Sequence, residues 1–436
     1  MARASVPQQQ TYFIQTLGCP KNEVDSEKLI GKLGSDGFSA TDNPDGADLL
    51  VVNTCAFIDE ARQESIDAIL ALVEHKADTS RLVVTGCMAE RYGQEIADAI
   101  PEVDLVAGFG EALDGHSHHR VGAASAATVT AVSITAKPPV PEFDLLNLPR
   151  PRSSRPWAYV KVAEGCDRAC GFCAIPSFRG PQRSRSLDDV LKEVDDLDAR
   201  EIVLVAQDLA AYGRDQGVGE RSIVPLVRAV SQRVERTRLL YLYPSDLTDG
   251  LIDAICETGV PYFDLSLQHV SAPLVRRMRR WGNGDKFLRR IEDIRAREPD
   301  AAFRSNFIVG YPGETEEDHD ELLRFVQEAQ VDWCGFFSFS PETGTYAADL
   351  DQQVDSELVS ERLAELRELQ DEITAKKRDE LLGREVQVLV DAPAVARTHR
   401  EAPEIDGIVT VPEHLEAGTF HTLTVTGALG PDLEAQ

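Results

Sequence analysis

The stretch EGCDRACGFC, residues 164–173, holds three cysteines in the spacing Cys166-x3-Cys170-x2-Cys173. It continues from AYVKVAEG (158–165), whose β-branched and apolar residues predict a strand. Barrel enzymes place their chemistry on loops at the carboxyl ends of their strands. We therefore expect residues 164–173 to form a functional loop at the end of a strand of an α/β barrel.

Three thiolates this close in sequence can ligate three irons of a 4Fe–4S cluster. The fourth iron then lacks a protein ligand, and open coordination is typical of a catalytic metal. Zinc is an alternative, but it usually takes four ligands and no fourth Cys or His lies nearby. Chance placement of the three cysteines is a second alternative. The spacing favours a catalytic cluster on Cys166, Cys170 and Cys173.

The surrounding region, 157–350, alternates strand-like and helix-like segments. Helical spacing is found in LDDVLKEVDDL (187–197) and EEDHDELLRFVQEAQ (316–330). Roughly six such units predict a partial or full (βα) barrel. The strand-like runs are AYVKVAEGC (158–166), EIVLVAQD (201–208), RLLYLYP (238–244), YFDLSLQH (262–269), AFRSNFIVGYP (302–312) and WCGFFSFS (333–340).

An amphipathic helix is expected over 355–382, with Gly383 as its stop. Its apolar stripe is expected to pack on the barrel and consists of Val359, Leu363, Leu366 and Ile373. Beyond it, EVQVLVD (385–391), DGIVTV (406–411) and TFHTLTVTG (419–427) predict a small all-β barrel.

Towards the N-terminus, residues 11–115 predict a parallel α/β domain. Its strand-like runs are TYFIQTLGC (11–19), DLLVVNTC (48–55), RLVVTGC (81–87) and VDLVAGFG (103–110). The segment after it is rich in Ala, Thr, Ser and Pro and predicts a linker. The expected domains are 11–115, a linker at 116–151, a core with its following helix at 152–375, and a terminal domain at 376–436.

Composition limits the class of protein. The 436 residues are 42% hydrophobic and 27% charged, which is typical of globular chains. We expect a cytoplasmic protein without a membrane span, because no apolar run is long enough and the first residues lack a signal-like apolar region. The net charge of −29 disfavours nucleic acid, unless a local basic patch intervenes, and favours a basic protein partner. The alternative is that the acidity serves solubility alone.

Cys19, Cys55 and Cys87 each end one of the first three N-terminal strands. The carboxyl ends of parallel strands share one edge of a sheet, so these thiols are expected to gather there. They would suit a second cluster with an open iron; three separate buried cysteines are the alternative. The two remaining cysteines, Cys256 and Cys334, lie among apolar residues and are expected to be buried structural thiols.

These motifs together resemble a known family. GCPKNEVDSE (18–27), NTCAFIDEA (53–61) and TGCMAERY (85–92), followed by EGCDRACGFCAIPSFRG (164–180), are similar to the methylthiotransferases of the radical S-adenosylmethionine superfamily. The resemblance extends from about residue 11 to the end, where the terminal β-barrel looks like a five-stranded, OB-like TRAM domain. It implies an α/β N-terminal domain, a partial (βα) barrel and two 4Fe–4S clusters.

The resemblance also implies a mechanism. The cluster on Cys166, Cys170 and Cys173 would cleave S-adenosylmethionine to a radical. The cluster on Cys19, Cys55 and Cys87 would carry or deliver sulfur. Two molecules of S-adenosylmethionine would be used, one for the methyl group and one for the radical, with an electron donor such as flavodoxin or ferredoxin.

The family divides by substrate. The words GCPKN (18–22) and CAFIDEA (55–61), together with APEIDGIV (402–409), resemble members that methylthiolate the β-carbon of an aspartate in small-subunit ribosomal protein twelve (uS12). Residues 376–436 contain six Lys or Arg and eleven Asp or Glu, which suits a basic protein better than RNA. The alternative is a tRNA methylthiotransferase of the MiaB type.

Further cofactor contacts are expected at the carboxyl ends of the barrel strands. Phe172 is expected beside the adenine, with core packing as the alternative. Gly310 and Gly313 are expected to let backbone approach the cofactor, with a turn as the alternative. The side chains expected at other strand ends are Gln207, Asp208, Ser266 and Gln268.

Three arginines and one histidine complete the candidates. Arg179, Arg183 and Arg185 would bind a cofactor carboxylate or pair with local acids, and the sequence leaves both open. His269 has no cysteine neighbour and is expected to be a structural hydrogen-bonding residue.

Overall fold

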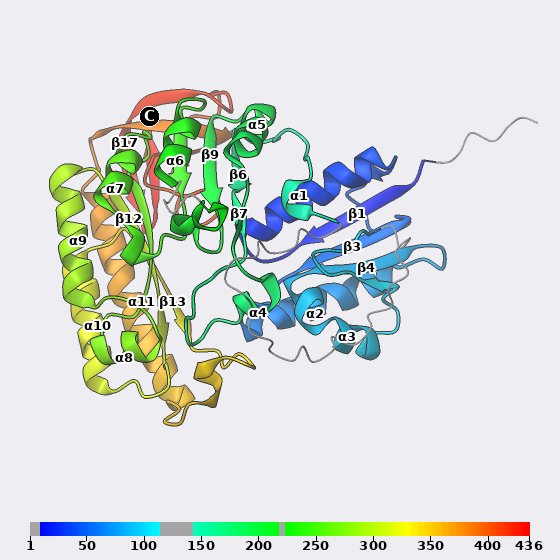
Figure 1. The fold of residues 1–436 in the computed structure, drawn as a ribbon. Helices are drawn as coiled ribbons and strands as arrows, with labels where there is room; N and C mark the ends of the chain where they lie inside the picture. Colours follow the sequence, from blue (N-terminus) through cyan, green and yellow to red (C-terminus); the bar gives the residue numbers. More distant parts are fainter. Residues whose placement is uncertain (1–8, 114–142, 218–222) are drawn as a thin grey trace, which may run out of the picture. The chain divides into compact units, whose positions relative to one another are not determined.

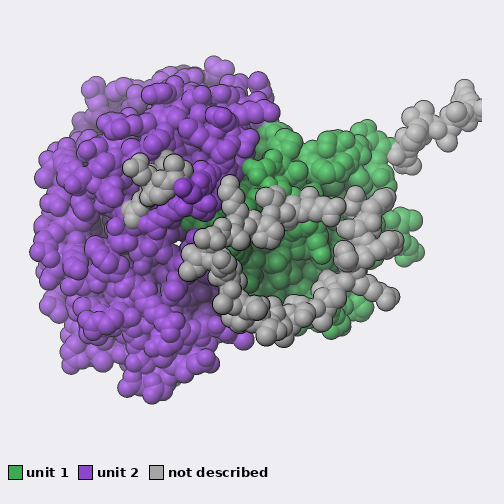
Figure 2. All heavy atoms as spheres, in the orientation of Figure 1, with its two compact units in different colours: residues 1–151, 177–183 green, residues 152–176, 184–436 purple. Residues whose placement is uncertain are grey.

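The computed structural model describes residues 9–113, 143–217 and 223–436. Most of the linker expected at 116–151 therefore lies outside the described residues. The chain forms two compact units (Figure 2). Unit 1 contains residues 1–151 together with 177–183, and unit 2 contains 152–176 and 184–436. In the described residues, no helix has both the length and the apolar character needed to cross a membrane.

Unit 1 is a doubly covered parallel sheet whose strand order in the described part is β2-β1-β3-β4-β5 (Figure 1). Its central strand reads LLVVNT and is buried along its whole length, as expected for a parallel strand with helices on both faces. The elements are β1 (Thr11–Thr16), α1 (Pro20–Ser35), β2 (Ser39–Ala40), β3 (Leu49–Thr54), α2 (Asp59–His75), β4 (Arg81–Gly86), α3 (Cys87–Ala99), β5 (Leu105–Val106) and η1 (Leu145–Asn147).

The two faces of this sheet pack against different helices. Leu29 and Leu33 of α1 join Val51 and Val83 in one apolar cluster. The other face packs against α2 and α3 through residues such as Ile69. The three predicted strands that end in cysteine are present, the fourth is the short β5, and the edge strand β2 was not expected from the sequence.

Unit 2 contains two three-stranded parallel sheets, β6-β9-β10 and β11-β12-β13. A parallel bridge between Leu242 and Leu265 connects them. No pairing between β6 and β13 closes the ring within the described residues, so the six strands form a partial barrel. The strands are β6 (Trp157–Lys161), β9 (Glu201–Val205), β10 (Arg236–Leu239), β11 (Tyr262–Gln268), β12 (Ala302–Val309) and β13 (Trp333–Ser338).

The helices of unit 2 cover the outer side of these strands and share one apolar core with them (Figure 1). Helix α10 begins with a reciprocal cap, in which Thr315 Oγ1 accepts from Asp318 N and the Asp318 carboxylate accepts from Thr315 N. The helices are α5 (Leu187–Leu197), α6 (Ile223–Ser231), α7 (Asp249–Cys256), α8 (Ala272–Arg277), α9 (Gly284–Arg297), α10 (Glu316–Ala329) and α11 (Ser356–Asp379). Short elements are β7 (Ala163–Glu164), α4 (Ile175–Arg179), β8 (Arg183–Ser184), η2 (Leu209–Ala211), η3 (Arg214–Gln216), η4 (Pro244–Asp246) and η5 (Tyr346–Asp349).

The long helix α11 packs on the barrel through the predicted stripe, because Leu363, Leu366 and Ile373 belong to the barrel core. After it the chain forms a closed five-stranded barrel in the order β14-β15-β16-β18-β17. Two of its strands, β15 and β18, were not expected from the sequence. The strands are β14 (Glu385–Ala392), β15 (Val395–Arg397), β16 (Val409–Thr410), β17 (Phe420–Leu429) and β18 (Asp432–Ala435).

This terminal barrel docks on the amino ends of the six barrel strands. Trp333, the first residue of β13, donates from Nε1 to Arg400 O at 2.6 Å. Tyr262, the first residue of β11, donates from its hydroxyl to Asp406 Oδ2 at 2.6 Å. The opposite, carboxyl ends of the strands are thereby left for the functional loops.

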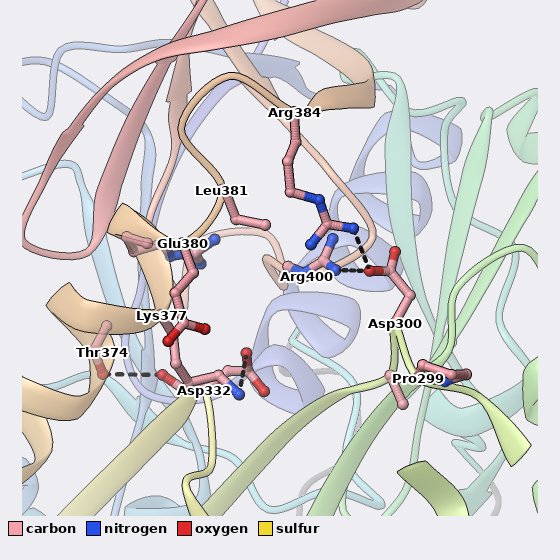
Figure 3. A pocket seen from close by; sticks show the side chains of 11 residues that line it. Pro299, Asp300, Asp332, Thr374, Lys377, Glu380, Leu381, Arg384 and Arg400 are labelled. Atoms are coloured by element: carbon pink, nitrogen blue, oxygen red, sulfur yellow. Dashed lines mark hydrogen bonds and ion pairs between the residues drawn. The ribbon is translucent and has the colours of Figure 1, made fainter. Parts of the chain in front are cut away.

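Charged side chains are buried where the terminal barrel and the core meet. Arg238 and Arg397 both donate to the fully buried Glu201, at 2.8 and 3.1 Å. A polar hollow of about 130 Å³ is lined by residues of α11 and of the segment after it, by the residues just before β12 and β13, and by Arg400 of the terminal barrel (Figure 3). There Arg384 and Arg400 pair with the same carboxylate, that of Asp300.

Candidate functional site: two cysteine trios

Cys19, Cys55 and Cys87, the N-terminal trio, lie at one edge of the sheet of unit 1. Strand pairing aligns Thr54 with Gly86, so the cysteine that follows each of them leaves the sheet at the same level. Cys19 is the N-cap of α1 and Cys87 is the first residue of α3. Both helices therefore direct the positive ends of their dipoles towards the sulfurs, which favours thiolates.

The glycines before two of these cysteines permit close packing of the strand ends. A Cβ atom on Gly18 would lie 2.8 Å from Cys55 Cβ and 2.9 Å from Cys55 Sγ. A Cβ atom on Gly86 would clash with the backbone of Thr54. The Gly-Cys pairs at 18–19 and 86–87 thus allow the strand ends that carry the cysteines to pack closely without steric conflict.

Arg179 contacts the N-terminal trio from the short segment 177–183 that belongs to unit 1. Its Nη2 donates to Cys87 Sγ at 3.0 Å and to Asn22 Oδ1 at 2.8 Å. Its Nη1 donates to Asp25 Oδ2 at 3.2 Å, and both side chains of this ion pair are nearly fully buried. Of the two roles that the sequence left open, the structure places Arg179 in an ion pair.

The environment shifts the thiol pKa values of this trio in different directions. Burial would raise the pKa of Cys19, but Lys21, the backbone N–H of Asn22 and Arg179 hold it below its ordinary value. Burial, reinforced by the other two cysteines, raises the pKa of Cys55 to about 12. Burial also raises the pKa of Cys87, although Arg179 opposes the shift. Three simultaneous thiolates would therefore need a bound cation or cluster.

Two further polar groups support the trio. Asn22 donates from Nδ2 to Leu17 O at 3.0 Å and to Thr54 O at 2.9 Å, which ties together the ends of β1 and β3. Ser65 of α2 donates to Cys55 O at 2.9 Å and accepts from Cys55 N at 3.0 Å. Asn22 lies within the motif GCPKN (18–22), but neither its role nor that of Ser65 is indicated by the neighbouring sequence.

Cys166, Cys170 and Cys173, the core trio, lie on the loop that follows β6 and β7 in unit 2. The loop is fixed by Cys173 N, which donates to Cys170 O at 3.2 Å, and by Gly171 N, which donates to Met278 O at 2.8 Å. Arg280 donates from Nη1 to Cys170 Sγ at 3.2 Å and from Nη2 to Ser266 O.

Burial again raises the thiol pKa values here. Burial raises the pKa of Cys166 to about 11, with a further contribution from the Asp208 carboxylate. Burial and the two neighbouring cysteines raise the pKa of Cys173 to about 12. As in unit 1, positive charge from a bound group would favour the thiolate forms of Cys166 and Cys173.

The side chains predicted at the strand ends lie beside this loop and are already engaged. Asp208 accepts from Arg168 Nε at 2.6 Å. Gln207 donates from Nε2 to Glu164 Oε1 at 2.6 Å. Ser266 contributes its carbonyl oxygen to Arg280, and Gln268, at the end of β11, has a left-handed backbone with φ of 73°. Whether they contact a cofactor stays a prediction.

The remaining predicted contacts have packing roles in the structure. Phe172 packs against an apolar cluster that includes Tyr311 and Met278. Gly310 has φ of 80°, and a Cβ atom there would clash with Val359 of α11. Gly313 has φ of 85° in the turn that follows. These observations explain the residues structurally and leave their predicted cofactor contacts untested.

The other basic and histidine candidates have protein partners. Arg183 donates to Asp144 Oδ1 at 2.7 Å, and Arg185 lies 2.7 Å from Glu193 Oε2. His269 is fully buried and accepts from Ser271 N at 3.1 Å, and burial lowers its pKa to about 4. The local-acid and structural interpretations of these residues therefore hold.

The donor chemistry of both trios fits iron–sulfur clusters. All eight cysteines are free thiols, and each trio has an arginine N–H directed at one sulfur, as is common around cluster ligands. Among the described side chains, no group of three or more His, Cys, Asp or Glu is arranged to hold a single metal ion. Cys256 and Cys334 are partly buried against the barrel core, apart from both trios.

Three family models match successive parts of the chain. Residues 11–108 match the uncharacterized protein family UPF0004, 160–326 match the radical SAM superfamily, and 382–436 match the TRAM domain. The fold class predicted from the sequence is thereby confirmed: an α/β domain, a partial (βα) barrel and a small all-β TRAM barrel.

Similar proteins align over nearly the whole chain. Ribosomal protein uS12 methylthiotransferase RimO from Moorella thermoacetica is 43% identical and covers 94% of this chain and 95% of its own. The protein of the same name from Kineococcus radiotolerans is 40% identical and covers 97% and 96%. Among solved structures, the radical S-adenosylmethionine methyltransferase TsrM from Kitasatospora setae is 14% identical, covers 94% and 82%, and has a TM-score of 0.48. Because relatives such as these align over nearly the full length, the chain belongs to the RimO family of radical S-adenosylmethionine methylthiotransferases.

Proposed function

We propose that the protein transfers a methylthio group to the β-carbon of an aspartate in small-subunit ribosomal protein uS12. The observation that carries this proposal is the near-full-length similarity to proteins named for that reaction. The two cysteine trios, on separate parallel strand edges, support it because the reaction needs both a sulfur source and a radical source.

We further propose that each trio holds one 4Fe–4S cluster. Cys19, Cys55 and Cys87 would hold the first, and Cys166, Cys170 and Cys173 the second. When bound, these groups would supply, respectively, the sulfur and the reductive cleavage of S-adenosylmethionine to a 5′-deoxyadenosyl radical. Two molecules of S-adenosylmethionine would be consumed for each product, one for the methyl group and one for the radical.

The protein's own groups prepare both sites. Arg179 and Arg280 would each place a positive charge and a hydrogen-bond donor on one ligand sulfur. Buried surroundings exclude water, which strengthens these interactions. Phe172, Gln207, Asp208, Ser266, Gln268, Gly310 and Gly313 are proposed to surround the S-adenosylmethionine that binds beside the core trio.

The charge of the terminal barrel supports a protein substrate over tRNA. Within 385–436, both basic residues, Arg397 and Arg400, are buried against the core. Its exposed charged side chains are all carboxylates, namely Glu385, Glu404, Glu413, Glu416 and Glu434. Such a surface attracts a basic ribosomal protein and repels RNA. An electron donor such as flavodoxin or ferredoxin, and a cytoplasmic location with the ribosomes, complete the proposal.

The test is mass spectrometry after reconstitution with iron and sulfide. The enzyme is incubated with S-adenosylmethionine and a reductant, together with either purified uS12 or tRNA. A methylthio mass gain on the aspartate of uS12 is expected, with about eight irons per chain as the mark of two clusters. A gain on tRNA alone would overturn the substrate in favour of the MiaB type.

A further inference from the structure

A basic patch interrupts the acidic surface of unit 2. Residues 276–290, RRMRRWGNGDKFLRR, contain seven Lys or Arg and one Asp, whereas the whole chain has 45 basic and 74 acidic residues. The segment runs from the end of α8 into the first turns of α9. We define the basic patch as its exposed members without a carboxylate partner among the described residues, together with Trp281: Arg276, Arg279, Trp281, Lys286 and Arg289.

Aromatic rings lie among these cations. Trp281 is 45% exposed, and the ammonium group of Lys286 lies 5.3 Å from the centre of its ring. The guanidinium group of Arg279 lies 3.8 Å from the ring centre of Tyr346, which is 39% exposed. Cations interleaved with exposed aromatic rings are the combination that binds single-stranded nucleic acid, through phosphates and stacked bases.

A cavity of about 320 Å³ opens beside Trp281. Leu247, Leu265 and Leu267 contribute apolar lining, while Lys286 and Arg289 line it with positive charge. Asp293 also lines it, so the cavity is not uniformly positive. An apolar floor with cations at the side suits a nucleotide, whose base is flat and apolar on its faces and whose phosphate is anionic.

The patch adjoins the loop of the core trio. Met278 O, between Arg276 and Arg279, accepts from Gly171 N at 2.8 Å. The next arginine, Arg280, donates to Cys170 Sγ. In Figure 1, α8 lies at the end of unit 2 remote from the terminal barrel. A partner bound on the patch would therefore lie next to the proposed radical site.

We propose that the basic patch binds the ribosomal RNA that surrounds the substrate protein. This inference rests on the proposed function, since a ribosomal protein is basic and would be repelled by the patch, whereas the RNA that it binds is attracted. The patch would thus let the enzyme engage uS12 also while uS12 is bound to RNA, with RNA phosphates on the patch and one base in the cavity beside Trp281.

The first test measures binding of a fluorescein-labelled 12-nucleotide oligouridine RNA by fluorescence anisotropy over a series of KCl concentrations. Lys286→Ala combined with Arg289→Ala is expected to weaken binding roughly tenfold at low salt. It should also lower the slope of log affinity against log salt by about 0.7 for each lost phosphate contact. Trp281→Ala is expected to weaken binding by a similar factor at every salt concentration, because stacking is not ionic.

A matched control removes the same charges elsewhere. The control combines Lys192→Ala on α5 with Arg324→Ala on α10. Like the patch pair, it removes one exposed lysine and one exposed arginine from helices. Arg324 and Arg289 also make equivalent hydrogen bonds. The Nε of each donates to the backbone oxygen four residues earlier in its own helix, at 3.2 and 3.1 Å. The control pair is expected to leave oligouridine affinity within twofold of wild type. An equal loss of oligouridine affinity for both pairs of substitutions, or no loss of affinity for the patch pair, would refute the proposal.

Competition then identifies the partner. Small ribosomal subunits are expected to displace oligouridine from wild type more effectively than tRNA or poly-L-glutamate does. Displacement by poly-L-glutamate at equal strength would make the patch an acidic-protein site, and preferential displacement by tRNA would make it a tRNA site. Both outcomes contradict the proposal. Methylthiolation of RNA-free uS12 by the wild-type enzyme is measured separately. Failure of RNA binding at the basic patch is therefore distinguishable from failure of the proposed function.

Discussion

The guanidinium group of Arg179 donates a hydrogen bond to the sulfur of Cys87 across 3.0 Å, although 92 residues separate them in sequence. The same guanidinium forms an ion pair with Asp25 and lies 3.9 Å from the centre of the Phe109 ring. These contacts fix the cation beside the N-terminal trio, in a place where water scarcely reaches.

Replacing Arg179 should destabilise the protein strongly. Arg179→Leu removes the guanidinium group that pairs with the buried Asp25 carboxylate, which costs roughly 3 kcal/mol of unfolding free energy. Urea unfolding monitored by circular dichroism measures this loss. Arg183→Leu is the control, because its ion pair with Asp144 is about one-fifth exposed and should cost about 1 kcal/mol or less. Similar losses for both variants would contradict the assigned burial.

Arg179→Lys should separate the electrostatic role from the packing role. A lysine keeps the charge beside Asp25 but lacks the fork that reaches both Cys87 and Asn22. With the cluster reconstituted, weaker donation to the ligand sulfur should make the midpoint potential more negative, since hydrogen bonds to sulfur tune that potential. A redox titration followed by electron paramagnetic resonance measures the shift. An unchanged potential would assign Arg179 a purely structural role.

The two trios should be separable by single substitutions. Cys166→Ala is expected to abolish cleavage of S-adenosylmethionine to 5′-deoxyadenosine. Cys55→Ala is expected to leave that cleavage measurable and to remove methylthio-aspartate. Chromatography of the nucleoside and mass spectrometry of uS12 provide the two readouts, with Cys256→Ala as the control for loss of a thiol outside both trios. Methylthio-aspartate formed by the Cys55 variant would refute the role of the N-terminal trio.

Gly310→Ala should disturb the packing of α11. Its new methyl group would meet Val359, and the positive φ adds strain, so we expect a loss of about 2 kcal/mol in unfolding free energy. Gly344→Ala has a similar φ of 82° but open space, and measures the backbone strain alone. Adding Val359→Ala to Gly310→Ala should recover part of the difference. No recovery in this double-mutant cycle would show that the clash is relieved in some other way.

The buried Glu201 should make stability depend on pH. Burial opposes ionisation of this carboxyl, but Arg397 and Arg238 outweigh it and lower its pKa to about 2. The unfolded chain binds this proton near pH 4.5, so the stabilisation is complete above that pH and declines as the pH falls towards 2. The difference in unfolding free energy between wild type and Glu201→Gln should be constant from pH 7 to 5. It should shrink by about 1 kcal/mol by pH 3.5.

A control carboxylate makes this measurement specific. Glu235 pairs with Arg200, and both side chains are nearly half exposed. Glu235→Gln should differ from wild type by a small amount that varies little over the same pH range, because solvent screens the pair. An equal pH dependence for both variants would attribute the effect to the overall charge of the protein.

The gathering of the N-terminal trio was predictable because it follows from chain direction. Parallel strands expose their carboxyl ends at one edge, so a cysteine at the end of each strand is necessarily near the others. The (βα) alternation and the helical stripe on α11 were predictable for a different reason, because the spacing of apolar residues along the chain indicates each helix and strand locally.

The arginine donors were not predictable, because their partners are distant in sequence. FRGPQRSRS showed three arginines against the acidic trend, but nothing local indicated that residues 177–183 join unit 1. The sequence predicts that Gly310 lies beside a cofactor, whereas its neighbour in the structure is Val359 of α11. The charged network around Glu201 was equally hidden, since buried ions cannot be told from exposed ones by composition.

The segment 177–183 has a consequence for protein engineering. Unit 1 is discontinuous, because the polypeptide completes it only after it has already contributed Cys166, Cys170 and Cys173 to unit 2. A fragment ending at residue 151 would lack Arg179, so the surroundings of its N-terminal trio would be incomplete. Chimeras that exchange the two units between relatives at a single crossover would combine the arginine of one parent with the cysteines of the other. The two cysteine trios are thus linked through one continuous stretch of chain, and an exchange of complete units requires three junctions, after residues 151, 176 and 183.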